Sequence, residues 1–156
     1  MTVRMAKMST EEIVRFLMQG TFTGKLATTR KDRGSHVVPI WFVLDNKSSS
    51  RDEIGDIVFI IYDKSIEAEN IKQDNRVSIC VDDQAPMFSF VTIFGTTKIY
   101  PYKQEEVLMW ATKIAERYMG KENAEEYGRR NSGDGTLLVQ ITPERIIGEK
   151  DTADLE

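Results

Sequence analysis

Hydrophobic positions near the start of the chain recur at helical spacing. The segment Ser9-Thr-Glu-Glu12 is typical of a capping box, and Ile13, Phe16 and Leu17 follow it at intervals of three and one. The first glycine after them is Gly20. We therefore predict one amphipathic helix over about residues 9–20.

From Thr21 onward the pattern changes to the alternation expected of strands. The segments TFTGKLATTR and SHVVPIWFVLD are separated by KDRG, a polar turn that ends at Gly34, and this arrangement predicts a β-hairpin. A polar loop, NKSSSRDEIGD, follows over residues 46–56. The next run, IVFIIYD, is dense in β-branched and aromatic residues, which predicts a strand buried on both faces.

The second half of the chain mixes helical and strand patterns. Gly95 lies inside a long strand-like segment, where a glycine commonly marks a bulge or a close approach of backbone. Pro143 interrupts the last strand-like segment. The expected elements are a helix over 64–74, a strand over 75–83, a long bent strand over 86–102, helices over 102–118 and 121–130, and a strand over 136–150 before a polar tail.

This order of elements differs from the regular alternation of a doubly wound sheet. It predicts a single domain over residues 1–156 that is mainly β. We expect a mostly antiparallel barrel with helices packed on its outside.

Composition narrows the class of protein. A formal charge of −4 argues against a general nucleic-acid binder, which needs a surplus of lysine and arginine. Cys80 is the single cysteine of the sequence, so one chain can build neither a disulfide framework nor a thiolate metal cluster. With no signal-peptide pattern and no apolar run near the ~20 residues that span a bilayer, we expect a cytoplasmic protein without a membrane partner.

The segment HVVPIWFVLD holds the single histidine, His36, and a proline within an apolar run. Without a second histidine or a cysteine ligand, His36 does not predict a zinc site. It is either a strand-end histidine or a ligand contact. Pro39 indicates either an edge strand or a place where backbone groups freed from the ladder bind a flat heterocyclic ligand.

Lys64 and Ser65 stand at the start of a predicted helix. A cation, a hydroxyl and free helix amides together suit a phosphate, although the same residues are typical of an ordinary N-cap beside a solvated lysine. The first hairpin also carries positive charge, which indicates either a solvated turn or a contribution to anion binding. Its basic residues are Lys25, Arg30, Lys31 and Arg33.

Several ordered segments together resemble one known family. They are GKLATTRKDRGSHVVPIWFVLD, IVFIIYDKSIEAENIKQDNRVSICVDD, VTIFGTTKIY and ITPERIIGEK. They are similar to the pyridoxamine 5′-phosphate oxidase-like family of FMN-binding split barrels, and more narrowly to its branch of deazaflavin-dependent oxidoreductases. The resemblance implies a six-stranded antiparallel split β-barrel that dimerises and binds FMN or the deazaflavin coenzyme F-420 in clefts between subunits.

The resemblance also implies cofactor-binding residues in three segments. The strand that lines the flavin ring would comprise His36, Val37, Val38, Pro39, Ile40 and Trp41. The neighbouring strand would contribute Ile60 and Ile61, and the turn that holds the phosphate would comprise Lys64, Ser65, Ile66 and Glu67. Where the family commonly has a lysine, this chain has Glu67, which would repel a phosphate unless it turns away. Lys64 or His36 would then have to supply the missing charge.

The resulting hypothesis is a homodimeric oxidoreductase that uses FMN or F-420 to transfer a hydride to or from a small organic substrate. In such chemistry the ring carries the reactive atom, which explains why no catalytic acid or base stands out. Two alternatives stay open. One is a non-catalytic protein that binds or stores a flavin or another heterocycle, and the other is a dimer whose cleft is empty.

Overall fold

All strand pairings in the computed structural model, which describes residues 6–45 and 53–155, are antiparallel. The strands are β1 (Ala6–Lys7), β2 (Gly24–Thr29), β3 (Ser35–Ile40), β4 (Phe42–Asp45), β5 (Asp56–Tyr62), β6 (Arg76–Asp82), β7 (Phe90–Ile99) and β8 (Thr136–Lys150). The helices are α1 (Thr10–Leu17), α2 (Ile66–Gln73), α3 (Gln104–Met119), the 3-10 turn η1 (Lys121–Asn123) and α4 (Ala124–Arg130).

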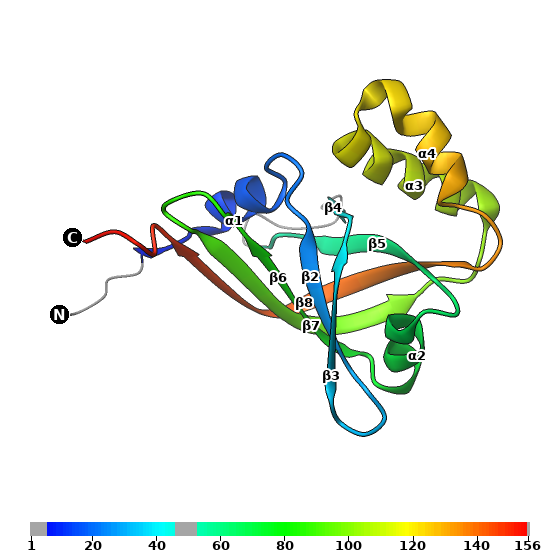
Figure 1. The fold of residues 1–156 in the computed structure, drawn as a ribbon, viewed down its shortest axis with the longest axis horizontal. Coiled ribbons are helices and arrows are strands. Elements are labelled where there is room, and N and C mark those ends of the chain that lie inside the picture. The colour runs from blue at the N-terminus through cyan, green and yellow to red at the C-terminus, as the bar shows by residue number, and fades with distance from the viewer. Residues whose placement is uncertain (1–5, 46–52, 156) are drawn as a thin grey trace.

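The described strands form one curled sheet (Figure 1). Their order is β3-β2-β6-β7-β8-β5-β4, and β1 pairs with one end of β8. The mainly β split barrel expected from the sequence is confirmed. The strand count is eight because β1 is added and because the apolar run 36–45 is divided at Trp41 into β3 and β4.

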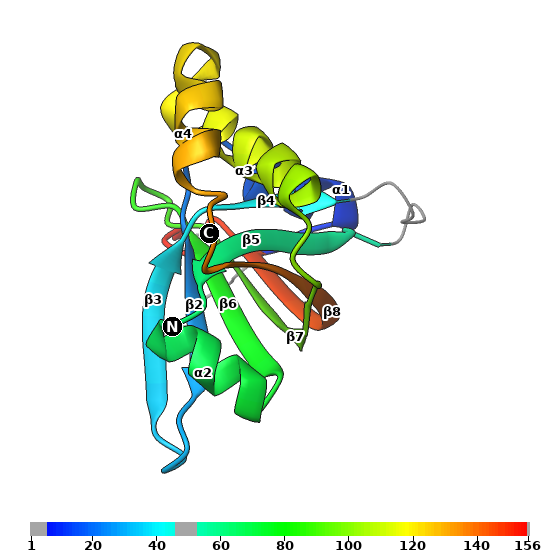
Figure 2. The ribbon, with the colours of Figure 1, turned by 90° about the vertical axis from the view of Figure 1, so that its right-hand side faces the viewer.

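The division at Trp41 places β3 and β4 at opposite ends of the hydrogen-bonded path, although they are consecutive in the chain. The barrel is therefore joined there by covalent chain and not by a ladder. Figures 1 and 2 show α2 on one side of the β5 ribbon and the pair α3–α4 on the other.

The core explains why β5 carries no polar alternation. Ile57, Val58 and Phe59 are all buried, since two separate clusters cover the two faces of the strand. Ile57 and Phe59 belong to the large cluster inside the sheet, and Val58 belongs to a smaller one against α3. The predicted strand with both faces buried is confirmed.

The start of the first helix also agrees with the sequence. The Ser9 side chain accepts a hydrogen bond from the Glu12 amide at 3.2 Å, and the Glu12 carboxylate accepts one from the Ser9 amide at 3.1 Å. This is the predicted capping box. Ile13, Phe16 and Leu17 then enter the core, so the helix seals one end of the barrel.

Gly95 and Pro143 face each other across β7 and β8, where the register shifts. A Cβ atom on Gly95 would lie 2.3 Å from the Thr142 carbonyl oxygen, so the expected close approach of backbone is confirmed. The sequence predicted a break at Pro143, and the structure has the shift in register there while β8 continues as one strand from Thr136 to Lys150. Pairing with β5 ends at Ile141. Pro143 has no amide hydrogen to donate, but no carbonyl of β5 lies opposite it, so no ladder hydrogen bond is lost.

Residues 46–52 of the predicted polar loop lie outside the described residues. Among the helices that the structure describes, none is long and apolar enough to cross a membrane.

Candidate functional site

A cleft of about 300 Å³ lies where the ends of the sheet meet α3 and α4. Its apolar lining comes from strands β3 and β5, the β3–β4 junction and helix α3. Its polar lining comes from α2, from the end of α4 and the residue after it, and from the start of β8. The lining residues are Pro39, Ile40, Trp41, Ile60, Ile61, Tyr62, Glu67, Ala111, Ile114, Arg130, Asn131 and Thr136.

Half of the residues that the sequence assigns to a cofactor come together in this cleft. They are Pro39, Ile40, Trp41, Ile60, Ile61 and Glu67. The other six, His36, Val37, Val38, Lys64, Ser65 and Ile66, do not line it. Their assignment to a cofactor stays a prediction.

Pro39 lies on an edge strand, because among the described residues β3 pairs with β2 alone. The Arg30 amide donates to the Gly34 carbonyl at 2.8 Å, which fixes the alternation of bonded and non-bonded pairs along the hairpin. Counted from there, the pair Lys25–Pro39 is a non-hydrogen-bonded one. The missing amide hydrogen of Pro39 therefore removes no hydrogen bond from the β2–β3 ladder. Val37 lies two residues away in a pair of the same kind, so its amide and carbonyl also face away from β2.

His36 lies outside the cleft, on the face of β3 that turns toward α2. Its cross-strand partner is Thr28, whose hydroxyl accepts a hydrogen bond from the Asn70 amide group at 3.0 Å. The His36 Nδ1 atom is buried and has no hydrogen-bond partner among the described residues. His36 therefore makes no direct contribution to the lining of the cleft.

The start of α2 has the contacts of an ordinary helix cap. The Ser65 hydroxyl accepts from the Ala68 amide at 3.2 Å and donates to the Tyr62 carbonyl at 2.7 Å, so its hydrogen-bonding capacity is used locally. Glu67 and Glu69 occupy the first turn, where carboxylates complement the helix dipole. These carboxylates oppose a phosphate at the same place.

Three polar residues of the cleft lie at the junction of α4 and β8. None of them was singled out from the sequence. Arg130 is the last residue of α4, Asn131 follows it, and Thr136 begins β8. The Thr136 hydroxyl is engaged with the Gly133 carbonyl at 2.7 Å. Arg130 is the one cation among the lining residues that the structure describes.

Arg130 and its neighbour Arg129 differ in their contacts. Arg129 forms an ion pair with Glu125 at 3.1 Å. The Arg130 guanidinium instead lies over the Tyr127 ring, 5.6 Å from its centroid, and has no carboxylate partner among the described residues. Arg130 is therefore the arginine that is free to meet an anion in the cleft.

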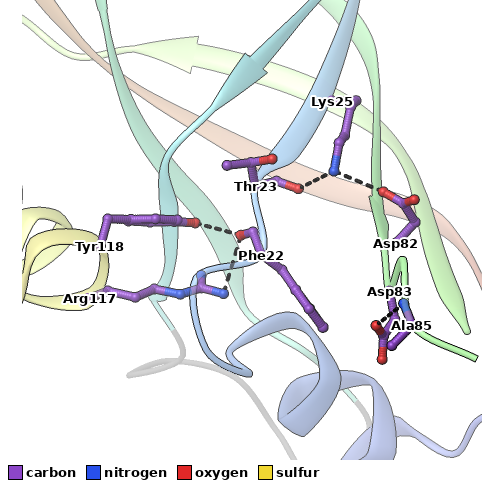
Figure 3. Close-up of polar contacts among 8 residues, drawn as sticks. All are labelled: Phe22, Thr23, Lys25, Asp82, Asp83, Ala85, Arg117 and Tyr118. Atoms are coloured by element: carbon purple, nitrogen blue, oxygen red, sulfur yellow. Dashed lines mark hydrogen bonds and ion pairs between the residues drawn. The ribbon is translucent and has the colours of Figure 1, made fainter.

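Two side chains at the end of α3, Arg117 and Tyr118, fix the β3–β4 junction at Phe42. Figure 3 shows their additional contacts with Phe22, which precedes β2. The Tyr118 hydroxyl donates to the Phe22 carbonyl at 2.8 Å and accepts from the Phe42 amide at 3.2 Å. Arg117 donates to the carbonyls of Leu17 at 2.6 Å and of Phe42 at 2.8 Å. Burial raises the pKa of Tyr118 and lowers the pKa of Arg117.

The basic residues of the first hairpin do not line the cleft. The Lys25 ammonium binds Asp82 at 2.8 Å and the Thr23 carbonyl at 3.2 Å, as Figure 3 shows. Arg30 lies 3.6 Å from Asp32 within the turn. Arg30 therefore has the exposed contacts expected of a solvated turn, whereas Lys25 lies in β2 and is paired with Asp82.

A family model described as pyridoxamine 5′-phosphate oxidase matches residues 9–149. No curated protein matches the chain.

Solved structures share the fold at low sequence identity. A conserved hypothetical protein from Mycobacterium tuberculosis has a TM-score of 0.76 at 22% identity, over 100% of this chain and 95% of that one. An F420 reductase has a TM-score of 0.62 at 20% identity, over 85% and 94%. The heme storage protein from Vibrio cholerae has a TM-score of 0.67 at 17% identity, over 91% and 96%.

Proposed function

The chain belongs to the pyridoxamine 5′-phosphate oxidase family, and from this premise we propose that its cleft binds FMN or F-420 for hydride transfer to or from a small organic substrate. The observation that carries the proposal is the composition of the cleft. Trp41 and four isoleucine side chains line it beside an exposed strand edge and a free cation. The isoleucines are Ile40, Ile60, Ile61 and Ile114.

The residues present suit a flat ring with a charged tail. Apolar walls exclude water from a heterocycle, and the backbone groups of β3 that face away from β2 offer hydrogen bonds to its edge. The volume of about 300 Å³ is at the lower end for ligand pockets. One subunit would then cover only part of the cofactor, which supports a cleft completed by a second subunit.

When bound, the cofactor supplies the hydride chemistry, and the chain supplies binding and orientation. Trp41 and Ile114 would hold the ring in place and keep water from it. Glu67 is the one carboxylate among the lining residues that the structure describes, so it is the candidate group to accept a hydrogen bond from the substrate.

A homodimer is part of the proposal. Val37 is 60% exposed, Tyr62 is 61% exposed and Ile66 is 53% exposed, and exposed apolar side chains that gather beside a cleft suit an interaction surface. Val37 is two residues from Pro39 on the same face of β3, and Ile66 adjoins Glu67. Light scattering during gel filtration should give twice the chain mass, and a monomer would contradict this part of the proposal.

The second candidate function is storage or binding of a heterocycle without catalysis. Haem is a poor fit for this cleft, because haem iron in proteins is held by His, Cys, Met or Tyr. Among the described lining residues only Tyr62 is of these types. The donor set therefore favours a flavin or deazaflavin over haem.

The decisive experiment is titration of apo-protein with FMN and, separately, with F-420, followed by cofactor fluorescence. We expect one of them to bind with a Kd below about 100 μM, a free energy of about −5.5 kcal/mol. Binding of neither below that concentration contradicts the proposed function. Reduction of the bound cofactor, followed by reoxidation with candidate substrates, then separates an enzyme from a storage protein.

A further inference from the structure

We infer that Arg130, at the end of α4, recognises the anionic group of the cofactor, and that the start of α2 does not. This inference deepens the proposed function and rests on it. It gives the ligand a direction, with its ring against Trp41 and its phosphate at the junction of α4 and β8.

The start of α2 lacks what a phosphate needs in this chain. Lys64 does not line the cleft, and the Ser65 hydroxyl is already engaged with Ala68 and Tyr62. The residue that α2 does contribute is Glu67, a carboxylate. A phosphate at this place would face a like charge and would find no free hydroxyl on Ser65.

The junction of α4 and β8 has the opposite character. Arg130 brings a guanidinium, which matches phosphate oxygens in a bidentate geometry. It has no competing carboxylate among the described residues, whereas Arg129 is paired with Glu125. The Asn131 side chain beside it also lines the cleft and has no hydrogen bond to another described residue, so its amide can donate to the same group.

The two charges lie on opposite walls. Glu67 belongs to α2 and Arg130 to α4, and Figure 2 shows these helices on opposite sides of the β5 ribbon. No ion pair joins them in the described structure. A ligand between them is therefore oriented by attraction at one wall and repulsion at the other.

The test compares FMN with riboflavin, which has the same ring and no phosphate, on wild-type protein and on Arg130→Ala. Arg129→Ala is the matched control for loss of a neighbouring cation, and Lys64→Ala tests the rival position at α2. F-420 is titrated in parallel on each protein. Affinity is read from cofactor fluorescence, and the melting temperature of each variant reports its folding.

We expect Arg130→Ala to weaken FMN, or F-420 if that is the cofactor bound, by about tenfold or more, as for loss of a charge-assisted hydrogen bond. Riboflavin should change by less than about twofold, and so should every affinity in Arg129→Ala and Lys64→Ala. Unchanged cofactor affinity in Arg130→Ala overturns this inference but not the proposed function. An equal loss of affinity for FMN and for riboflavin has the same meaning. Failure of wild-type protein to bind either FMN or F-420 overturns the proposed function itself.

Discussion

Trp41 and Tyr118 stack with their ring centroids 5.1 Å apart and their planes 8° from parallel. Trp41 marks the break between β3 and β4, and Tyr118 lies near the end of α3. The stack therefore links the wall of the cleft to a residue of α3 that lies 77 positions later in the chain. Its geometry is held by the Tyr118 hydroxyl, which bonds to the backbone of Phe22 and Phe42.

Tyr118→Phe keeps the stacked ring and removes the hydroxyl contacts with the backbone of Phe22 and Phe42. We expect it to lower the free energy of unfolding by about 1–3 kcal/mol, because partly buried backbone groups lose a partner. Tyr127→Phe is the control, since the Tyr127 hydroxyl has no hydrogen bond to another described residue. Urea denaturation followed by tryptophan fluorescence gives both values, and equal stability of Tyr118→Phe and wild type would show that the hydroxyl is dispensable.

Gly95→Ala tests the close approach of β7 to β8. The added methyl group would meet the Thr142 carbonyl oxygen at 2.3 Å, and backbone can relieve such a contact only by moving. We expect a loss of about 1–3 kcal/mol in the free energy of unfolding. Gly133→Ala is the matched control because nothing lies within 4 Å of its Cβ position, and a comparable loss there would remove the steric explanation.

The contacts of Glu12 at the start of α1 should make the stability of the fold depend on pH. Hydrogen bonds from Lys150 and from the Ser9 amide lower the pKa of Glu12 from 4.5 to about 2. A carboxyl group with a lowered pKa stabilises the fold above its ordinary pKa, and the contribution is lost as the pH falls toward the folded value. The difference in melting temperature between wild type and Glu12→Gln should be present at pH 6 and should shrink between about pH 4.5 and 2.

Glutamine at position 12 still caps the helix, so this comparison isolates the charge. Glu11→Gln is the control, because Glu11 has no ion pair among the described residues. A melting-temperature difference for Glu12→Gln that is constant across this pH range would argue against the ion pair with Lys150.

Glu67→Lys should partly restore binding lost in Arg130→Ala. A lysine at position 67 would attract the phosphate, whereas the carboxylate of Glu67 repels it. FMN affinity in the double variant should therefore exceed that of Arg130→Ala by about fivefold. Glu69→Lys in the same background is the control, since Glu69 lies on α2 but does not line the cleft. Equal recovery in both double variants would mean that only net charge matters.

Local sequence patterns predicted most of the fold, because each depends on neighbours in the chain. The capping box at Ser9 and the doubly buried strand at Ile57 are of this kind. The division at Trp41 and the continuous β8 through Pro143 were not predicted. Both depend on which strand lies alongside, and residue spacing carries no information on pairing between distant segments.

The candidate site divides in the same way. Pro39, Trp41 and Ile60 belong to the segments whose order resembles the family, so they were named from the sequence and they line the cleft. Arg130 was missed, because about ninety residues separate it from Trp41 and only the packing of α3 and α4 brings them together. A run of two arginines at the end of a predicted helix was its only signal, and that signal is common on solvated helices.

The break at Trp41 has a consequence for how such a protein can change over evolution. Ladder hydrogen bonds hold the sheet together, whereas much of the cleft is built from strand ends and from helices outside the ladder. Substitutions at Glu67, Arg130 or Asn131 can therefore change the polar lining of the cleft without disturbing strand pairing. Ile40 and Ile61, in contrast, belong both to the core and to the wall of the cleft, so evolution can vary the polar lining more freely than the apolar wall.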